Sequence, residues 1–410
     1  MSWRSTVAIS RAEAAPLAGG HSLRGRLVAL CFLAQNCAMG FAFGSFGPLL
    51  ASTEEHFGIS RTVASTGMSL IMLAIGGLAP FLGTLLVHRS VRSAMIAGAL
   101  LSAVGYWGLA FLHSFALGLV MYALIGTGVS LTAIIGPLVL ISRWFDANRA
   151  RMLSFVNLPI ALFVIPYLIA RALPEYGRVA VLGGLGTVFL VLAPALLLLV
   201  EHPPSRDPQP RITAAKEAAA AITSTAILRV PAFWFLSIGM GIMAGAGTAY
   251  VVHIVPFGMQ QHMSLAAASG LLSIYSGAGI FGTLLFGWIA DRLGPPAALV
   301  ISASCQAVLW WSLLQVNGTL LYVAAALLGI CVVPLTTLHG AALSRMFGAT
   351  AVGRAIGFSY SVKLPFIFVF APAMGWVFDV SGGYRTPFLL TAGLMVLSST
   401  SFYVTKKLSD

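Results

Sequence analysis

The strongest chemical signal in this sequence is a single lysine, Lys363, which stands inside a long apolar stretch. A charge at the middle of a membrane helix costs about 2.5–3.5 kcal/mol even on lenient insertion scales. Such a residue is retained when its charge is used, and an ammonium group in an apolar cavity attracts an anion. Tyr360 precedes Lys363 by one helical turn and lies on the same face, where its hydroxyl is placed to donate to that anion. We therefore predict that both residues bind substrate.

The other candidates for this site are polar side chains in otherwise apolar stretches. They are Gln35, Asn36, Tyr122, Asn157, Tyr250, His253, Thr283 and His339. The two histidines can also carry a proton or gate the site, because imidazole titrates near neutral pH. The alternative for each residue is a hydrogen bond between helices, which contributes about 0.6 kcal/mol on average.

Motifs for catalysis, cofactors and metals are missing from the sequence. It has no His-Asp pair at plausible depth, no nucleophile motif and no metal-spaced His/Cys cluster. Its glycine runs fall inside apolar stretches without a following Lys-Ser/Thr, which favours helix packing over phosphate binding. Cys31, Cys37, Cys305 and Cys331 have no CxxC partner, so we predict buried thiols. We expect no enzyme, no cofactor and no metal site.

Composition indicates which elements position these residues. The chain of 410 residues is 59% hydrophobic and only 8% charged, whereas a soluble domain carries about 25% charged residues. Apolar blocks of roughly 20 residues have the length of a membrane helix. Lipid leaves backbone groups no other partners, so each block must be helical. We predict an all-α polytopic membrane protein, whose net charge of +12 contacts lipid rather than nucleic acid.

Twelve transmembrane helices are predicted, with Ser60 and Ser264 as N-caps. Their ranges are 26–51, 62–87, 93–112, 116–142, 152–172, 179–200, 231–257, 264–289, 296–315, 319–342, 355–378 and 385–404. With both termini in the cytoplasm, 18 of the 23 Lys and Arg residues fall on the cytoplasmic side and four on the outer side. The positive-inside rule therefore favours this orientation in the cell membrane.

The two halves of the chain repeat each other. Asn157-Leu158-Pro159 is followed by Pro166, and Lys363-Leu364-Pro365 is followed by Pro372 at the same spacing. Asn157 and Lys363 are thus equivalent positions in two six-helix pseudo-symmetric bundles, with the substrate site near the midplane between them. The predicted organisation is a cytoplasmic tail (1–24), an N-terminal bundle (25–200), a cytoplasmic linker (201–230), a C-terminal bundle (231–404) and a second tail (405–410).

The segment Gly287-Trp288-Ile289-Ala290-Asp291-Arg292-Leu293-Gly294 resembles the loop signature of the major facilitator superfamily. The resemblance implies the major facilitator fold. It also implies a conformational switch, in which Asp291 caps a helix end and pairs with basic residues across the seam between the halves. Gly287 and Arg292 belong to the same signature. In the first-half copy the Asp position is Val87, and only Arg92 keeps its basic character.

Within that superfamily, Phe46-Gly47-Pro48-Leu49, the segment 56–61 and Tyr360-Ser361-Val362-Lys363 look like the oxalate/formate antiporters and monocarboxylate porters. The antiporters place a substrate-binding lysine in this span, which implies an organic anion as substrate. The arginine that these families often carry in span 8 is Thr283 here. A single cation favours a monocarboxylate, or a larger apolar molecule with one carboxylate.

The expected function is secondary transport of such an anion by a monomer in the lipid bilayer, with a coupling proton or a counter-anion as a further partner. Two alternatives stay open. The first is an exporter of drug-like or amphipathic solutes. The second is a membrane enzyme or sensor, against which the missing catalytic motifs and the short loops argue.

Overall fold

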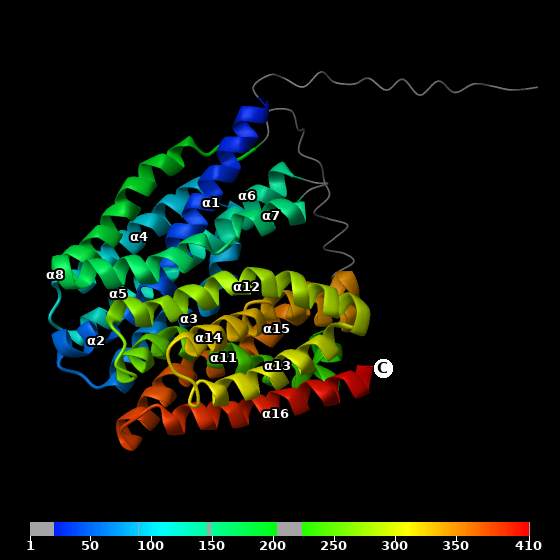
Figure 1. Cartoon of the computed structure of the whole chain (residues 1–410). Coiled ribbons are helices and arrows are strands. Elements are labelled where there is room, and N and C mark those ends of the chain that lie inside the picture. The colour runs from blue at the N-terminus through cyan, green and yellow to red at the C-terminus, as the bar shows by residue number, and fades with distance from the viewer. Residues whose placement is uncertain (1–19, 89, 146–148, 203–223, 410) are drawn as a thin grey trace, which may run out of the picture.

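The computed structural model describes residues 20–88, 90–145, 149–202 and 224–409, and every regular element within these ranges is a helix. Most of the predicted tail 1–24 and of the predicted linker 201–230 lies outside the described residues. Figure 1 shows the long helices running roughly side by side.

The described residues of the first half form ten helical elements. They are α1 (Gly20–Gly44), α2 (Phe46–Phe57), α3 (Arg61–His88), α4 (Val91–Phe111), α5 (Phe115–Val129), a π-helical turn (Ser130–Ile135), α6 (Gly136–Trp144), α7 (Arg149–Val156) and α8 (Ile160–Ala195), after which a 3₁₀ turn covers Leu196–Leu198. The second half contains α10 (Ser224–Leu228), α11 (Pro231–Gln260), α12 (Leu265–Leu293), α13 (Pro295–Ser312), α14 (Thr319–Val332), α15 (Leu335–Ser381) and α16 (Arg385–Ser409).

Twelve membrane-crossing helices are confirmed. Nine described segments are long and apolar enough to cross a membrane, and one of them, Arg151–Leu198, contains both the fifth and the sixth predicted span. The helices α3 and α13 supply the second and the ninth. Helices α8 and α15 each bend sharply at a glycine with positive φ, Gly177 (φ 75°) and Gly348 (φ 73°), so that each belongs to two spans.

The first predicted span is longer than expected and is interrupted. Helix α1 ends at Gly44, and α2 continues from Phe46 to Phe57, beyond the predicted limit at residue 51. The Oγ of Ser45 donates to the carbonyl of Phe41, and this competition with the backbone accompanies the break. Because α2 extends so far, Glu54 lies inside a helix rather than in a loop.

The repeated Asn/Lys-Leu-Pro segments differ in structure. Helix α7 stops at Val156, and α8 begins at Ile160 after Asn157-Leu158-Pro159. The backbone N–H of Ala161 has no helical partner there and donates to the Oδ1 of Asn36, at 2.9 Å. The equivalent stretch around Lys363 and Pro365 stays helical within α15. The sequence repeat is therefore not a repeat of backbone geometry.

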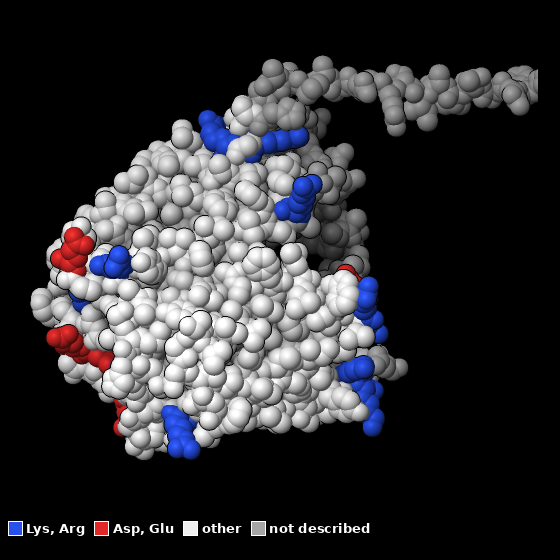
Figure 2. Space-filling model, viewed as in Figure 1, with Lys and Arg blue, Asp and Glu red and all other residues white. Residues whose placement is uncertain are grey.

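The outer surface of the helices fits lipid. Large apolar side chains point away from the protein, as with Phe281 (70% exposed) and Leu284 (73% exposed) on α12. Cys305 is also exposed on α13, so its predicted burial is wrong, whereas the other three thiols are buried and all four are free. Because one face of a span is turned toward lipid, an apolar residue on that face is exposed at the surface of the protein. In Figure 2 many visible Lys and Arg side chains lie along the top and the right edge, where α1 begins and α16 ends, and most visible Asp and Glu lie on the left, together with a few basic side chains.

Most contacts between the first and the second half of the described chain are made by α3 with α15, α8 with α12, and α2 with α11. Glycines allow the close approach. A Cβ on Gly47 of α2 would lie 2.7 Å from the carbonyl oxygen of Val251, and one on Gly375 of α15 would lie 3.0 Å from the backbone nitrogen of Thr62. The division into bundles 25–200 and 231–404 stays a prediction.

Candidate functional site

Lys363 lies in the second part of α15, and only 3% of its surface is exposed. Its Nζ is 3.3 Å from the Nδ1 of His339 and 3.6 Å from the centre of the Tyr360 ring. Both partners are uncharged groups that suit a cation, since an aromatic face attracts positive charge. No ion pair of Lys363 with an acidic side chain is found in the part of the chain that the structure describes. The ammonium therefore keeps a charge that no carboxylate of these residues balances.

A chain of hydrogen bonds extends from Lys363 toward α11. The Nε2 of His339 is 2.8 Å from the Oγ of Ser359, and that oxygen accepts from the Oγ of Ser237 at 2.8 Å. All four side chains are buried. His339 was predicted from sequence, whereas Ser237 and Ser359 were not, because serines in apolar helices usually bond their own backbone.

Tyr360 has a different position from the one expected. The face of its ring, rather than its hydroxyl, contacts Lys363, and 43% of the residue is exposed. Its ring also lies 6.2 Å from that of His339 at a steep angle. Tyr360 thus forms one wall of the Lys363 site.

Three predicted site residues of the first half lie at or near the break between α7 and α8. Asn157 lies at the break itself, and Gln35 and Asn36 lie close to it in α1. Asn36 spans the gap between helices, donating to the carbonyl of Phe32 and accepting from the N–H of Ala161. Gln35 is buried, and its Oε1 has no hydrogen-bond partner among the residues that the structure describes. Asn157 is exposed. The structure joins none of these three to Lys363 by a hydrogen bond among the described residues.

The aromatic candidates pack inside their own halves. Tyr122 is buried against Phe46 of α2 and lines a small cavity that Arg178 also borders. Tyr250 stacks on Tyr275 with ring centres 4.3 Å apart. Neither tyrosine contacts Lys363 through the hydrogen bonds and ring contacts of the described ranges. Thr283 bonds the carbonyl of Gly279 in its own helix, at 3.1 Å.

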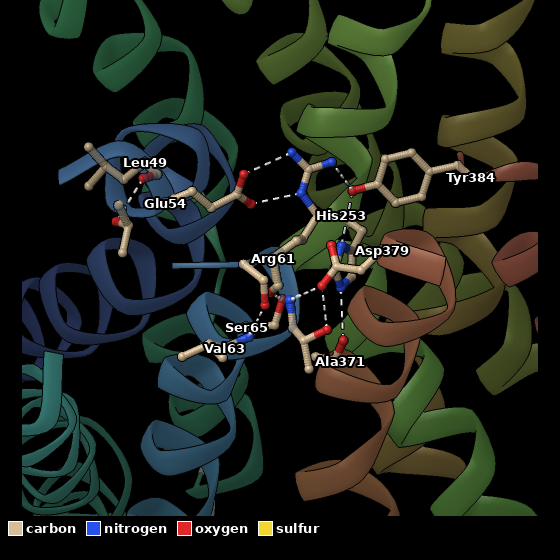
Figure 3. Close-up of polar contacts among 12 residues, drawn as sticks. Leu49, Glu54, Arg61, Val63, Ser65, His253, Ala371, Asp379 and Tyr384 are labelled. Carbon is tan, nitrogen blue, oxygen red and sulfur yellow. Dashed lines mark hydrogen bonds and ion pairs between the residues drawn. The ribbon is translucent and has the colours of Figure 1, made fainter. Parts of the chain in front are cut away.

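His253 belongs to a second polar cluster, at the end of the molecule formed by the stop of α2 and the start of α3 (Figure 3). Its Nε2 donates to the carbonyl oxygen of Ala371 at 2.9 Å, and its Nδ1 lies 3.1 Å from the hydroxyl of Tyr384. The imidazole is fully buried. We call the cluster of Glu54, Arg61, Thr62, His253, Asp379 and Tyr384 the gate cluster.

Arg61 joins the two halves in the gate cluster. Its guanidinium donates two hydrogen bonds of 2.7 and 3.0 Å to the carboxylate of Glu54, and its Nη1 donates to the hydroxyl of Tyr384 at 3.2 Å. The guanidinium carbon also lies 4.2 Å from the centre of the Phe378 ring. Glu54 thus orients Arg61 from its own half, while the second half supplies an acceptor and an aromatic face.

Asp379 makes the second link between the halves. Its Oδ2 accepts from the backbone N–H and the hydroxyl of Thr62, at 3.1 and 2.5 Å. The first N–H groups of a helix lack partners, and a carboxylate there also meets the positive end of the helix dipole. Asp379 of α15 therefore caps α3 from the opposite half, beside the predicted cap Ser60, whose Oγ accepts from Val63.

A third link between the two halves lies further along α3, at Ser69. Pro372 has no N–H, so the carbonyl of Phe368 four residues earlier loses its helical partner. The Oγ of Ser69 in α3 donates to this carbonyl at 2.5 Å. The proline repeat noticed in the sequence thus creates a contact between the halves, and the gate cluster continues down the α3–α15 seam.

Sequence reasoning missed most of the gate cluster. The sequence singles out His253 alone as a site residue; Arg61 is one of the four basic residues on the predicted outer side, and Asp379 directly follows the predicted span 355–378. The sequence has an acid at one span end and an arginine at another span start, but only the structure shows that their helices, α15 and α3, face each other. The hydrogen bond between Thr62 and Asp379 joins positions that are 317 residues apart. The spacing of residues in the sequence does not predict such a contact.

The predicted switch residues lie at the other end of the molecule, and no ion pair among the described residues joins them to the first half. Asp291 is exposed and has no ion pair in the described ranges, and Arg292 stacks on Trp288 at 4.0 Å. Gly287 has open space around it. Arg92 stays within its own half, where its Nη1 donates to the carbonyls of the turn after α8, Leu197 and Leu199.

Glu201 holds this end of the first half together. It accepts hydrogen bonds from the Oγ of Ser90 and from the backbone N–H of Arg92, and it pairs with Arg143 at 3.4 Å. Burial on its own would raise the pKa of Glu201, but these hydrogen bonds and the positive charge outweigh burial and lower it below 4.5. The ionised carboxylate is therefore the form that caps α4.

Replacing Glu201 with glutamine is expected to lower the melting temperature of the purified protein at pH 7. A carboxyl whose pKa is lower in the folded state stabilises the fold above its ordinary pKa and loses this effect as pH falls through the folded value. The difference from wild type should therefore shrink in melting curves recorded from pH 7 down to pH 4. Glu175→Gln, at an exposed glutamate, is the control and should change neither curve. An equal loss at both pH values would contradict this assignment.

The chain is similar to known transporters in sequence. The profile of the Major Facilitator Superfamily matches residues 32–319 and 260–408. Monocarboxylate transporter 12 of Rattus norvegicus is 27% identical over 175 residues, which cover 41% of this chain and only 35% of that protein. Monocarboxylate transporter 11 of Homo sapiens is 25% identical over 389 residues, which cover 89% of this chain and 80% of that protein.

The fold is similar to solved structures as well. A bacterial homolog of the human lysosomal transporter Spinster, crystallised in an inward-facing and unoccupied conformation, superimposes with a TM-score of 0.74. The two chains are 13% identical, and the match covers 94% of this chain and 97% of the other. At that identity the likeness concerns the arrangement of helices only.

Proposed function

Because this chain belongs to the major facilitator superfamily, a class of membrane transporters, we propose that it is a secondary active transporter whose cargo is a small organic anion, a monocarboxylate. The observation that carries this proposal is the buried ammonium of Lys363 with its neutral partners His339 and Tyr360. A buried cation without a carboxylate is costly, and a bound anion removes that cost. Binding of the substrate anion then also stabilises the closed conformation of the site.

The size of the charge in the site supports a cargo with one carboxylate. Among the described residues, Lys363 is the one lysine or arginine at this site. The position where related families often carry a second cation is Thr283, whose hydroxyl bonds its own helix. A dianion would leave one charge unpaired in a buried site. The names of the monocarboxylate transporters that the chain resembles point to the same class of cargo.

The two ends of the molecule support alternating access. At one end the gate cluster ties α3 to α15 through Arg61, Tyr384 and Asp379. At the other end Asp291 is unpaired within the described residues. We propose that the gate cluster faces outward, that both termini are cytoplasmic, and that the structure corresponds to the state closed to the outside. Transport would then alternate between the gate cluster and a lock formed by Asp291, Arg292 and Gly287 with Arg92.

A small monocarboxylate is expected to raise the melting temperature of the purified protein. A ligand that binds only the folded state stabilises it by about 2.7 kcal/mol at a concentration 100 times its Kd. Acetate, pyruvate and benzoate, screened from 0.1 to 30 mM against a sodium chloride control of equal ionic strength, sample small and aromatic carboxylates. Stabilisation by cationic or neutral amphipathic solutes, with no effect of any carboxylate, would instead support the alternative function of a drug or solute exporter.

A further inference from the structure

We propose that His339 is a positioning residue for the anion site: its neutral Nδ1 holds the ammonium of Lys363, and Ser359 with Ser237 keeps the imidazole in the tautomer that leaves Nδ1 free to accept. This inference rests on the proposed function, because it assigns residues that act on the anion only through Lys363.

The first step in the argument is the direction of the hydrogen bond between Lys363 and His339. A charged lysine has three donors and no acceptor, so the Nδ1 atom 3.3 Å away must offer a lone pair. The imidazole is then neutral, with its hydrogen on Nε2. A protonated or Nδ1–H imidazole would point an N–H at the ammonium and push it away.

The second step is that the serine pair selects this tautomer. With its hydrogen on Nε2, His339 donates to the Oγ of Ser359 at 2.8 Å, and the same oxygen accepts from Ser237 at 2.8 Å. An oxygen with two lone pairs can accept both hydrogen bonds. Ser237 comes from α11, whereas Ser359 and Lys363 come from α15. This series of hydrogen bonds therefore also fixes the imidazole between two spans.

The third step concerns the donors left for substrate. One N–H of Lys363 points at His339, and the Tyr360 ring covers a second side of the ammonium at 3.6 Å. At most the remaining N–H is free to meet a carboxylate oxygen. Holding the long side chain in one orientation before the anion arrives removes an entropy cost from binding, which is the usual benefit of preorganisation.

The titratable and charged groups around the imidazole are few. Lys363 and Tyr360 face it from α15, and the described residues of α11 contribute Ser237 by way of Ser359. His253 lies in the gate cluster, bonded to Tyr384 and Ala371. The charge that His339 experiences is therefore mainly that of Lys363, and the neutral form of the imidazole is the form compatible with it.

The experiment compares four variants in binding of benzoate, acetate and pyruvate to the purified full chain. His339→Leu removes the acceptor and should weaken binding of the carboxylate that wild type binds by about tenfold, since hydrogen bonds to charged groups have effects of this size. His339→Asn places an oxygen near the position of Nδ1 and should stay within about threefold of wild type. His339→Gln places its oxygen toward Ser359 instead and should resemble His339→Leu. Ser359→Ala should weaken binding by about threefold.

Two further readouts separate positioning from a structural role. In uptake assays the KM should rise while the maximal rate stays close to wild type, because the anion site is weakened and the gate is untouched. In nitrogen NMR of histidine-labelled protein, the His339 signals should show one tautomer with hydrogen on Nε2, and Ser359→Ala should mix the two tautomers.

The outcomes are distinguishable. If no carboxylate binds wild type, the proposed function fails. If Lys363→Gln abolishes binding while His339→Leu and His339→Gln bind as wild type does, the anion site stands and the role of His339 is refuted. Equal loss in all three His339 variants, with reduced maximal rate and melting temperature, would show that the imidazole is structural and would also overturn the inference.

Discussion

Replacing Lys363 with glutamine is expected to abolish uptake of monocarboxylates while leaving the protein folded. The amide is close in length to the lysine stem but carries no charge, so it cannot pair with an anion in the buried site. Leaving a buried anion without its cationic partner costs about 3–5 kcal/mol, which corresponds to about a 160- to 5,000-fold weaker binding. Uptake into proteoliposomes at substrate concentrations near the wild-type KM should therefore fall to background.

The folding of the variant can be separated from its function. Removing a buried charge that no carboxylate balances should leave the melting temperature of the empty protein unchanged or raise it, because the desolvation cost of the ammonium disappears. Lys407→Gln, at an exposed lysine near the end of α16, is the matched control and should transport normally. Wild-type uptake by a well-expressed Lys363→Gln protein would eliminate Lys363 as the substrate site.

Replacing Asp379 with alanine is expected to open the end of the molecule that carries the gate cluster. The variant loses both hydrogen bonds to Thr62 and the charge at the start of α3. Removing a helix cap costs about 0.5–2 kcal/mol. All of this stabilisation belongs to the closed state, because Asp379 and Thr62 lie in different halves. The ratio of open to closed molecules should therefore rise by about 2- to 30-fold.

Spin labels can report this change. Val63 and Val380 are exposed and adjoin the two partners of the contact, so labels at Val63→Cys and Val380→Cys, in a chain without its four natural cysteines, measure the separation of α3 and α15. The long-distance population should grow in Asp379→Ala and to a smaller extent in Asp379→Asn. Asp291→Asn, at the other end, is the control and should not increase this population. A distance distribution unchanged by Asp379→Ala would mean that the gate cluster does not hold the closed state.

Lys363 could be found from sequence because its signal is local. One charged residue in an apolar span is conspicuous wherever the other spans lie, and the Pro spacing made it the equivalent of Asn157 in the other half of the chain. Helix number was predictable for the same reason, since backbone hydrogen bonding in lipid forces each apolar block to be helical. The break at Ser45 accompanies a local hydrogen bond to Phe41, whereas the break at Asn157 has a partner in another helix, Asn36, and the sequence predicted neither.

The surroundings of Lys363 were only partly predictable. His339 was a candidate as a histidine in an apolar span, but its hydrogen bond to Lys363 depends on how two spans of α15 fold back on each other at Gly348. Asn36 shows the converse. Its amide was assigned to substrate from composition, and the structure uses it to bond the N–H of Ala161, which the break before α8 leaves without a helical partner. A buried amide signals a need for a hydrogen bond, not what kind of group meets that need.

The gate cluster was beyond sequence reasoning for a further reason. Arg61, Asp379 and Tyr384 lie at span ends, where charged and aromatic residues are common in any membrane protein. Their number and spacing are ordinary, and only the pairing of α3 with α15 makes them a unit. The loop signature around Asp291 was recognisable because it is contiguous, and no ion pair of Asp291 is found among the described residues.

The central claim is that the site recognises a negative charge through one cation, and one comparison tests it without any mutation. Binding of a carboxylate and of its uncharged amide is measured on the purified wild-type chain by the same thermal-shift titration, using the pairs benzoate and benzamide, acetate and acetamide, and pyruvate and pyruvamide. The amides match the acids in shape and lack the charge. We expect at least one carboxylate to stabilise the protein and its amide to have no effect at equal concentration. Equal stabilisation by an acid and its amide would contradict the account, because the ammonium of Lys363 would then not be what the substrate meets.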